Sequence, residues 1–318
     1  MEKDSNNIVN EEINLEALFG IFWLSKKFVI LVSFVTAVLF AIYSLQLPNI
    51  YQSSATLIGV SDSNATSISS SYSGLAQLAG VSLPKGSASK TDLALLVLKS
   101  RDLFKTFYVD EEFLAYLFAV KDYEVGSKKI ILDSNIYNEG DWSKDLFPKG
   151  KPDFLHAHNI FHKEHFNVNQ DEFSGTIYLS VEHQSPLVAQ EWLELIINRL
   201  NSYIKSKDVK EARMSLEYLN KKLVDTNVNA LQKGISDLIL QQIEIINLSE
   251  ISDEYALKIV DSPTSPETKS KPYRTWLTLV GGLMGFILSV FMVLILYYTN
   301  RKVDISLFPP TLKINKIY

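Results

Sequence analysis

Two long runs without a charged residue lie near the two ends of the chain. One is FVILVSFVTAVLFAIYSLQL, Phe28 to Leu47, and the other is TWLTLVGGLMGFILSVFMVLILYYT, Thr275 to Thr299. A helix of about 20 residues is roughly 30 Å long, which matches the hydrocarbon thickness of a bilayer. The alternative, a buried core helix, is disfavoured because two such runs occur. The sequence therefore predicts a protein that crosses a membrane twice.

The first run is expected to be an anchor rather than a cleaved signal peptide. A long segment with Glu11, Glu12 and Glu16 precedes it, and no small-residue cleavage site follows Ile42-Tyr43-Ser44. A signal peptide would have a short basic start and such a cleavage site. We therefore expect this run to stay in the chain.

Lysine and arginine residues near the two runs predict the orientation. Lys26 and Lys27 precede the first run, no cation follows it until Lys85, and Arg301 and Lys302 follow the second run. Because cytoplasmic loops carry the excess of positive charge, both termini are expected in the cytoplasm. The predicted parts are a cytoplasmic N-terminus at 1–27, a transmembrane helix at 28–47, an outer α+β domain at 48–274, a second transmembrane helix at 275–299 and a cytoplasmic tail at 300–318.

The overall composition excludes several classes of function. The chain has 318 residues and no cysteine, which excludes a disulfide framework and thiolate metal sites. A formal net charge of -5 gives no electrostatic reason to expect nucleic acid as a partner. The mean hydropathy of +0.06 is high for a soluble protein, and the excess lies in the two apolar runs.

Three segments of the outer domain are predicted as strands. IYQSSATLIGV, residues 50–60, and SGTIYLSVEHQ, residues 174–184, alternate in the way of half-buried strands. The third, YALKIVD at residues 255–261, is strand-like and leads toward the second apolar run.

Helices and irregular regions separate these strands. One helix is expected to start at Thr91-Asp92 and continue through LALLVLKSRDLFKTFYV, and another lies in EEFLAYLFAV, residues 111–120. Irregular structure is expected in a Ser-rich loop at 61–74, in its continuation to 89, and in a loop-rich middle from Lys121 to Gln170.

A very long helical pattern follows Ser185-Pro186 and continues to about Ser249, so long helices are expected at about 186–250. A single rod of about 65 residues would be roughly 95–100 Å long. The chain must return to the second apolar run, so we expect a helical hairpin with its bend near Asp225 to Ala230, or at Gly234.

An apolar stripe on the first part of this pattern has two interpretations. It could pack laterally against a partner, or it could form ordinary core, and the periodicity favours neither. The stripe consists of Leu193, Ile196, Ile197, Leu200, Tyr203 and Ile204.

Four of the five histidines lie in HAHNIFHKEH, residues 156–165. His158 and His162 could share a helix face, so these two and His165 are weak candidates for metal ligands. The order of residues is not HExxH, and the surroundings resemble a surface loop. We therefore expect no metal site, and an exposed, polar, pH-sensitive loop is the alternative.

No arrangement of residues predicts catalysis or cofactor binding. GSASKT, residues 86–91, lacks the second glycine and the preceding strand of a phosphate loop. The chain has no Gly-x-Ser-x-Gly nucleophile elbow. Consecutive acids at Asp110-Glu111-Glu112 are typical of the solvated first turn of a helix. We therefore expect no enzyme activity and no cofactor.

The segment DSPTSPETKSKP, just before the second apolar run, contains Pro263, Pro266 and Pro272. Each proline fixes its own φ and favours extended backbone at the residue before it, so a stiff, non-helical strut is expected. Three cations in and after this proline strut are expected at the depth of lipid headgroups, where they can meet phosphates. They are Lys269, Lys271 and Arg274.

Glycines mark one part of the second apolar run. Gly281, Gly282 and Gly285 remove side chains from a helix, and Gly281-x-x-x-Gly285 is a spacing that permits close helix approach. The partner could be the first apolar helix or a neighbouring subunit.

EYALKIVDSPTSPETKSKPYR, followed by a glycine-marked apolar helix, resembles the polysaccharide co-polymerase family, the Wzz chain-length determinants. The most specific part is Tyr255 to Gly285. The proline spacing departs from the family pattern, and the histidine-rich segment does not map onto it.

The resemblance implies a two-pass, non-enzymatic protein of the bacterial inner membrane with a periplasmic main domain. It implies a small mixed sheet at a membrane-proximal base, a long helical hairpin and a ring-like homo-oligomer. The expected partners are further copies of the chain, a polymerase of O-antigen or a related polysaccharide, and the growing lipid-linked glycan. The expected function is control of the modal length of lipopolysaccharide O-antigen.

Three alternatives stay open at this point. The glycan could be a capsule or exopolysaccharide, with a separate cytosolic kinase as partner. The chain could instead be a two-pass receptor with an outer ligand-binding domain, or a metal-dependent periplasmic enzyme.

Overall fold

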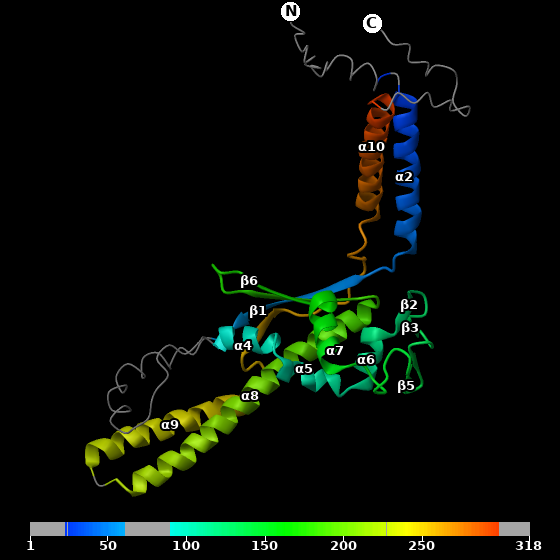
Figure 1. Cartoon of the computed structure of the whole chain (residues 1–318). Coiled ribbons are helices and arrows are strands. Elements are labelled where there is room, and N and C mark those ends of the chain that lie inside the picture. The colour runs from blue at the N-terminus through cyan, green and yellow to red at the C-terminus, as the bar shows by residue number, and fades with distance from the viewer. Residues whose placement is uncertain (1–22, 24, 61–89, 227, 299–318) are drawn as a thin grey trace, which may run out of the picture. The chain divides into compact units, whose positions relative to one another are not determined.

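The computed structural model describes residues 23, 25–60, 90–226 and 228–298 (Figure 1). It divides into two compact units, one formed by Met1–Pro48 with Lys271–Tyr318 and the other by Asn49–Ser270. The expected Ser-rich loop at 61–74, its continuation to 89 and most of GSASKT lie outside the described residues.

The first unit contains two helices, α2 (Lys26–Gln46) and α10 (Arg274–Tyr298), which lie side by side (Figure 1). Both are long and apolar enough to cross a membrane. Their register is antiparallel, because Gly281 of α10 lies against Phe40 of α2 while Gly285 lies against Thr36. The arrangement fits a two-pass membrane protein.

The second unit is built on a four-stranded sheet with the order β6-β7-β1-β8. The strands are β1 (Tyr51–Gly59), β6 (Phe166–Gln170), β7 (Ile177–His183) and β8 (Leu257–Asp261). The expected strands at 50–60, 174–184 and 255–261 are therefore confirmed. The expectation of a mixed sheet is wrong, since every described strand pair in this sheet is antiparallel. β7 and β8 do run in the same direction, but β1 lies between them.

One face of this sheet forms the core. Ala55 and Leu57 of β1 and Leu179 of β7 are almost completely buried, as the alternation predicts. Helix α8 (Pro186–Val224) packs on the sheet through residues that are also buried. The apolar stripe of α8 belongs to this core, which decides between its two interpretations: Leu193, Ile196, Ile197, Leu200 and Ile204 are at most 2% exposed, and Tyr203 packs against them.

The helix predicted from Thr91 to Val109 is wrong in one respect, because it is two helices. They are α4 (Lys90–Leu98) and α5 (Arg101–Tyr108). Ser100 separates them, since its Oγ accepts a hydrogen bond from the Leu103 N–H at 3.2 Å and so caps a new helix.

Helix α6 (Glu111–Phe118) begins after Asp110, whose carboxylate accepts from the N–H groups of Glu112 and Phe113. The three acids therefore form a capped first turn. The loop-rich middle predicted after it contains more regular structure than expected, in β2 (Val120–Glu124), β3 (Lys129–Leu132), β4 (Tyr137–Asn138), β5 (Asp141–Trp142), α7 (Phe154–Ile160), a π-helical turn η1 (Phe161–His165) and β6.

The long helical pattern forms a hairpin of α8 and α9 (Asn229–Ile251) (Figure 1). Pro186 occupies the first turn of α8, and Ser185 Oγ accepts from the Val188 N–H at 3.4 Å. The break lies within the predicted bend, while Gly234 is buried inside α9. Beyond the sheet, the two helices meet through Leu219 of α8 and through Ile235 and Leu238 of α9.

Asn201 joins the long helix to the edge strand β8. Its side chain is 3% exposed, and its Oδ1 accepts from the N–H groups of Ala256 at 2.8 Å and Leu257 at 3.0 Å. Its Nδ2 donates to the Leu257 carbonyl at 3.1 Å. This amide therefore satisfies backbone groups that would otherwise be buried without partners.

Replacing Asn201 by leucine is expected to lower the free energy of unfolding by about 1–3 kcal/mol, because two backbone N–H groups lose their acceptor. Urea denaturation of the full chain in detergent, followed by circular dichroism, measures this loss. The neighbouring Ser202 is exposed, so Ser202→Ala is the control and is expected to leave the midpoint unchanged. If Asn201→Leu and the unchanged chain unfold at the same urea concentration, the hydrogen bonds of Asn201 do not stabilise the domain.

Candidate functional site

The glycines of α10 lie against α2 of the same chain. A β-carbon at Gly285 would be 3.0 Å from Ser33 Cα and would overlap the Thr36 hydroxyl, and one at Gly281 would overlap the Phe40 ring. A β-carbon at Gly282 would lie 3.6 Å from Ala37 Cβ, which is an ordinary contact. Only glycine permits this helix separation at 281 and 285, whereas alanine would fit at 282.

The segment that follows β8 is hydrogen-bonded to β1 and to the residue before it. Ser53 is 1% exposed and its Oγ donates to the Thr264 carbonyl at 2.9 Å. The Ser270 N–H donates to the Ile50 carbonyl at 2.8 Å. Within this tethered segment Pro263 is buried and Pro266 is half-buried. Pro272 follows Ser270 and belongs to the unit that contains α10.

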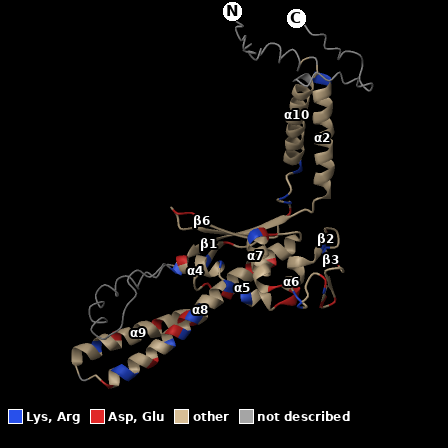
Figure 2. Ribbon diagram, in the orientation of Figure 1, with Lys and Arg blue, Asp and Glu red and all other residues tan. Residues whose placement is uncertain are grey.

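The three candidate interface cations lie within six residues of the chain, before and at the start of α10, where Figure 2 shows basic residues. Lys269 is exposed, and its Nζ donates to Asn49 Oδ1 at 3.2 Å. Lys271 is exposed as well, and Arg274 is the first residue of α10. Asn49 lies two residues before β1, so Lys269 adds a further link between the two ends of the unit Asn49–Ser270.

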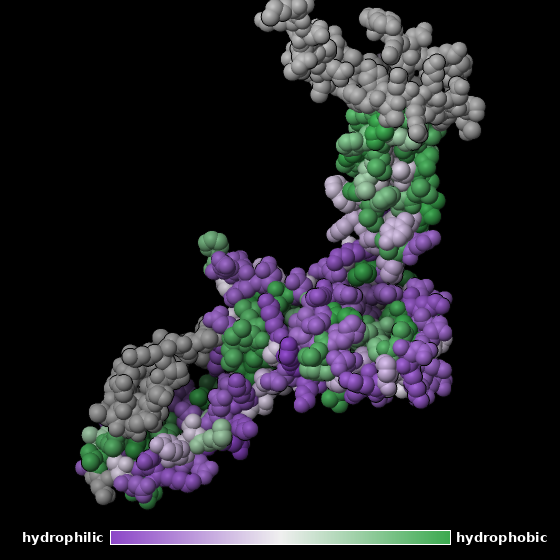
Figure 3. All heavy atoms as spheres, viewed as in Figure 1, coloured by the Kyte–Doolittle hydropathy of each residue, from purple (hydrophilic) through white to green (hydrophobic). Residues whose placement is uncertain are grey.

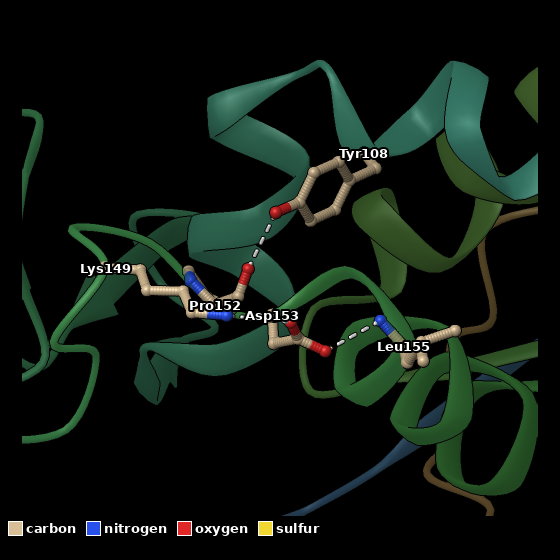
Figure 4. Close-up of polar contacts among 5 residues, drawn as sticks. All are labelled: Tyr108, Lys149, Pro152, Asp153 and Leu155. Carbon is tan, nitrogen blue, oxygen red and sulfur yellow. Dashed lines mark hydrogen bonds and ion pairs between the residues drawn. The ribbon is translucent and has the colours of Figure 1, made fainter.

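The histidine-rich segment is not a surface loop, which corrects the expectation. It forms α7 and η1, and Figure 4 shows how α7 begins. Asp153 Oδ2 accepts from the Leu155 N–H at 3.1 Å, and the Asp153 Oδ1 lies 4.0 Å from Lys149 Nζ. The Tyr108 hydroxyl donates to the Pro152 carbonyl at 2.8 Å, which ties this turn to α5.

Two of the three weak metal candidates, His162 and His165, place ring nitrogens within hydrogen-bond distance of backbone carbonyls. His162 Nδ1 lies 3.0 Å from the His158 carbonyl and its Nε2 lies 3.2 Å from the Leu98 carbonyl. His165 Nδ1 lies 2.8 Å from the Glu182 carbonyl. Among the described residues, no group of three or more histidines and carboxylates is placed to hold a metal ion. These imidazoles join η1 to α4 and to β7.

His183 is the histidine that the sequence analysis missed. It is 2% exposed at the end of β7, next to the start of α8. Its Nδ1 accepts from the Ser185 N–H at 2.9 Å, and its Nε2 donates to the Tyr116 carbonyl at 3.1 Å. The alternation of Ile177, Leu179 and Val181 continues to His183, and this was the available signal for its burial.

Burial in this aromatic region lowers the pKa of His183 to about 4, because the charged imidazolium loses its water. Burial also lowers the pKa of His165 and of His158, and at His158 the neighbouring His162 acts in the same direction. The Trp192 ring lies 5.0 Å from the His183 ring, centroid to centroid. Burial therefore favours the neutral form of His158, His165 and His183.

Comparisons with known proteins were made for the whole chain. Residues 11–110 match the family model "Wzz: Chain length determinant protein". Comparison with curated protein sequences gave no match.

Two solved structures are similar to the chain. A full-length bacterial polysaccharide co-polymerase is 12% identical, with 92% of this chain and 100% of that chain covered and a TM-score of 0.37. A fragment of WzzB, a polysaccharide co-polymerase from Salmonella Typhimurium, is 13% identical, with 70% and 100% covered and a TM-score of 0.28. Both TM-scores are low, so the assignment rests on the family match.

That match includes α2, β1, α4 and α5. The recognition made from the sequence is confirmed, since residues 11–110 match the model of the Wzz chain-length determinant family.

Proposed function

We propose that this protein sets the modal length of lipopolysaccharide O-antigen as an oligomeric, non-catalytic scaffold in the bacterial inner membrane. The observation that carries the proposal is the family match to chain length determinant proteins. The order of the elements supports it, since the described unit Asn49–Ser270 lies in the chain between two helices of membrane-spanning length.

In this proposal the outer domain is periplasmic and both termini are cytoplasmic. The domain would catalyse no reaction. Instead, several copies of the chain would present a repeated binding surface to a separate polymerase or to the lipid-linked glycan. The helix pair would fix each copy in the bilayer, and the proline strut with Lys269, Lys271 and Arg274 would hold the outer domain at headgroup level. The hydrogen bonds from Ser53 and Ser270 link the segment 264–270 to β1 and to the residue before it.

Deletion of the gene tests the function. The expected result is loss of the modal cluster of O-antigen chain lengths on a silver-stained gel, with a smooth distribution in its place, and its return when the full chain is supplied again. An unchanged ladder together with altered capsule or exopolysaccharide size would assign the protein to that other glycan. Unchanged length of every surface glycan would contradict the proposal.

A further inference from the structure

The connection between β7 and α8 is closed around a buried histidine. β7 ends at His183 and α8 begins at Pro186, so two residues, Gln184 and Ser185, connect them. His183 is 2% exposed and Ser185 is 1% exposed. The His183 Nδ1 accepts from the Ser185 N–H at 2.9 Å, while its Nε2 donates to the Tyr116 carbonyl of α6 at 3.1 Å. One imidazole therefore joins β7, the start of α8 and α6.

This arrangement fits the neutral ring and not the charged one. A proton on Nδ1 would point at the Ser185 N–H, and two donors cannot form a hydrogen bond with each other. Ser185 is also the N-cap of α8, since its Oγ accepts from the Val188 N–H and its carbonyl accepts from the Ala189 N–H. Protonation of His183 would therefore displace the residue that caps the first turn of α8.

Titratable groups face His183 from three other elements. The His165 ring of η1 lies 5.9 Å from the His183 ring, and the Tyr116 ring of α6 lies 6.4 Å from it, centroid to centroid. Tyr51 of β1 is opposite His183 in the sheet. The carboxylates of this region act on these neighbours: Glu112 and Glu191 on Tyr116, and Glu164 and Glu182 on His165. Burial and the charge of His165 both lower the pKa of His183, so the closed connection opposes a charge there.

The closed connection also contains an acceptor without a donor. Gln184 Oε1 is buried, and among the described residues it has no hydrogen-bond partner. A buried polar atom without a partner destabilises the form that buries it. Water would reach this oxygen and the His183 ring if the first turn of α8 moved outwards. The apolar residues that hold this turn in place are Val188 and Trp192, which are 3% and 5% exposed.

We propose that His183 is a proton-operated latch: the neutral ring holds the first turn of α8 on β7 and α6, and a proton on Nδ1 releases that turn while the rest of the unit Asn49–Ser270 stays folded. The proton comes from solvent, and the hydrogen bond that is lost is the one from the Ser185 N–H. Hydrophilic residues predominate on the side of this unit that Figure 3 shows. Release would add apolar surface from Val188 and Trp192. The inference does not depend on which glycan the protein controls.

Hydrogen–deuterium exchange of the full chain in detergent, at pH 7 and pH 5, tests the latch. The probes are the amides of Ser185, Val188 and Ala189, and the reference is the buried stretch 196–204 of the same helix. Protection factors correct for the intrinsic effect of pH on amide exchange. Since the open form takes up a proton with the ordinary pKa of 6.5 and the closed form with a pKa of about 4, protection of the probes should fall about 20-fold between pH 7 and pH 5. It should stay about tenfold or more below that of the reference at both pH values, because the opening is local.

His183→Gln supplies the comparison, because its amide offers an acceptor and a donor but takes up no proton. In this variant the protection of the three probes should be the same at pH 7 and pH 5, whereas the exposed control His156→Gln should keep the 20-fold change, which is about the value expected for the unchanged chain. Probes that are as protected as the reference at both pH values would overturn the latch, since the proton would then enter only on global unfolding. Probe protection that is independent of pH in the unchanged chain would overturn it as well. Both of these outcomes are measured on the unchanged chain, so they hold even if His183→Gln fails to fold.

Discussion

Replacing Gly281 and Gly285 together by leucine is expected to separate α2 from α10 and to abolish modal control of glycan length. Both glycines lie where any β-carbon would overlap α2, at Phe40 and at Thr36. Overpacking of a fitted interface costs about 1–3 kcal/mol per site, and leucine adds far more than one methylene. The paired helices would therefore move apart or rotate.

A disulfide between the helices measures this directly. The 3.6 Å between Ala37 Cβ and a β-carbon at Gly282 is within the range of disulfide-bonded residues, so Ala37→Cys with Gly282→Cys should cross-link efficiently. Adding Gly281→Leu and Gly285→Leu should abolish the cross-link, whereas adding Leu279→Ala, at an exposed position of α10, should leave it. Retained cross-linking in the leucine variant would show that the glycines do not set the helix separation.

Acidification is expected to destabilise the outer domain between about pH 6.5 and pH 4. The pKa of His183 falls from its ordinary 6.5 to about 4 in the folded domain, so in this range the unfolded chain binds the extra proton. The free energy of unfolding therefore falls as the pH falls, by about 3 kcal/mol in total for this group. The lowered pKa values of His165 and His158 add in the same direction.

Urea denaturation of the full chain at a series of pH values checks this. His183→Gln should lower stability at pH 7, because the Ser185 N–H and the Tyr116 carbonyl lose a fitted partner, and should flatten the dependence on pH. The exposed His156 provides the matched control, and His156→Gln should keep the slope. Two results would contradict the claim that His183 causes the pH dependence. One is an equal free energy of unfolding at pH 7 and pH 5, and the other is a pH dependence that both variants reduce equally.

Local patterns predicted the parts of this fold that depend on few distant contacts. The two apolar helices, strands β1 and β7, and the bend between α8 and α9 all follow from length and periodicity. The break at Ser100 was missed because the apolar residues on both sides keep a helical period. Ser100 is nevertheless a good N-cap residue, so the local signal was present.

Other features depend on contacts that no local pattern contains. Asn201 bonds residues 55 and 56 positions further along the chain, and His162 approaches a carbonyl 64 positions earlier. HAHNIFHKEH contains enough polar residues to resemble a loop. Its Phe161 nevertheless packs against Phe104 and Trp192 in an aromatic core. The glycine spacing indicated close helix approach, but the choice between α2 and a neighbouring subunit needed the helix register.

The central claim is that the two apolar helices hold the unit Asn49–Ser270 outside the cytoplasm. Single cysteines at Lys210 in that unit and at Ser5 near the N-terminus can be labelled with a membrane-impermeant maleimide, since the natural chain has none. In spheroplasts with an intact inner membrane, Lys210→Cys should be labelled at once and Ser5→Cys only after lysis. Labelling of Ser5→Cys before lysis, with Lys210→Cys protected, would contradict the account.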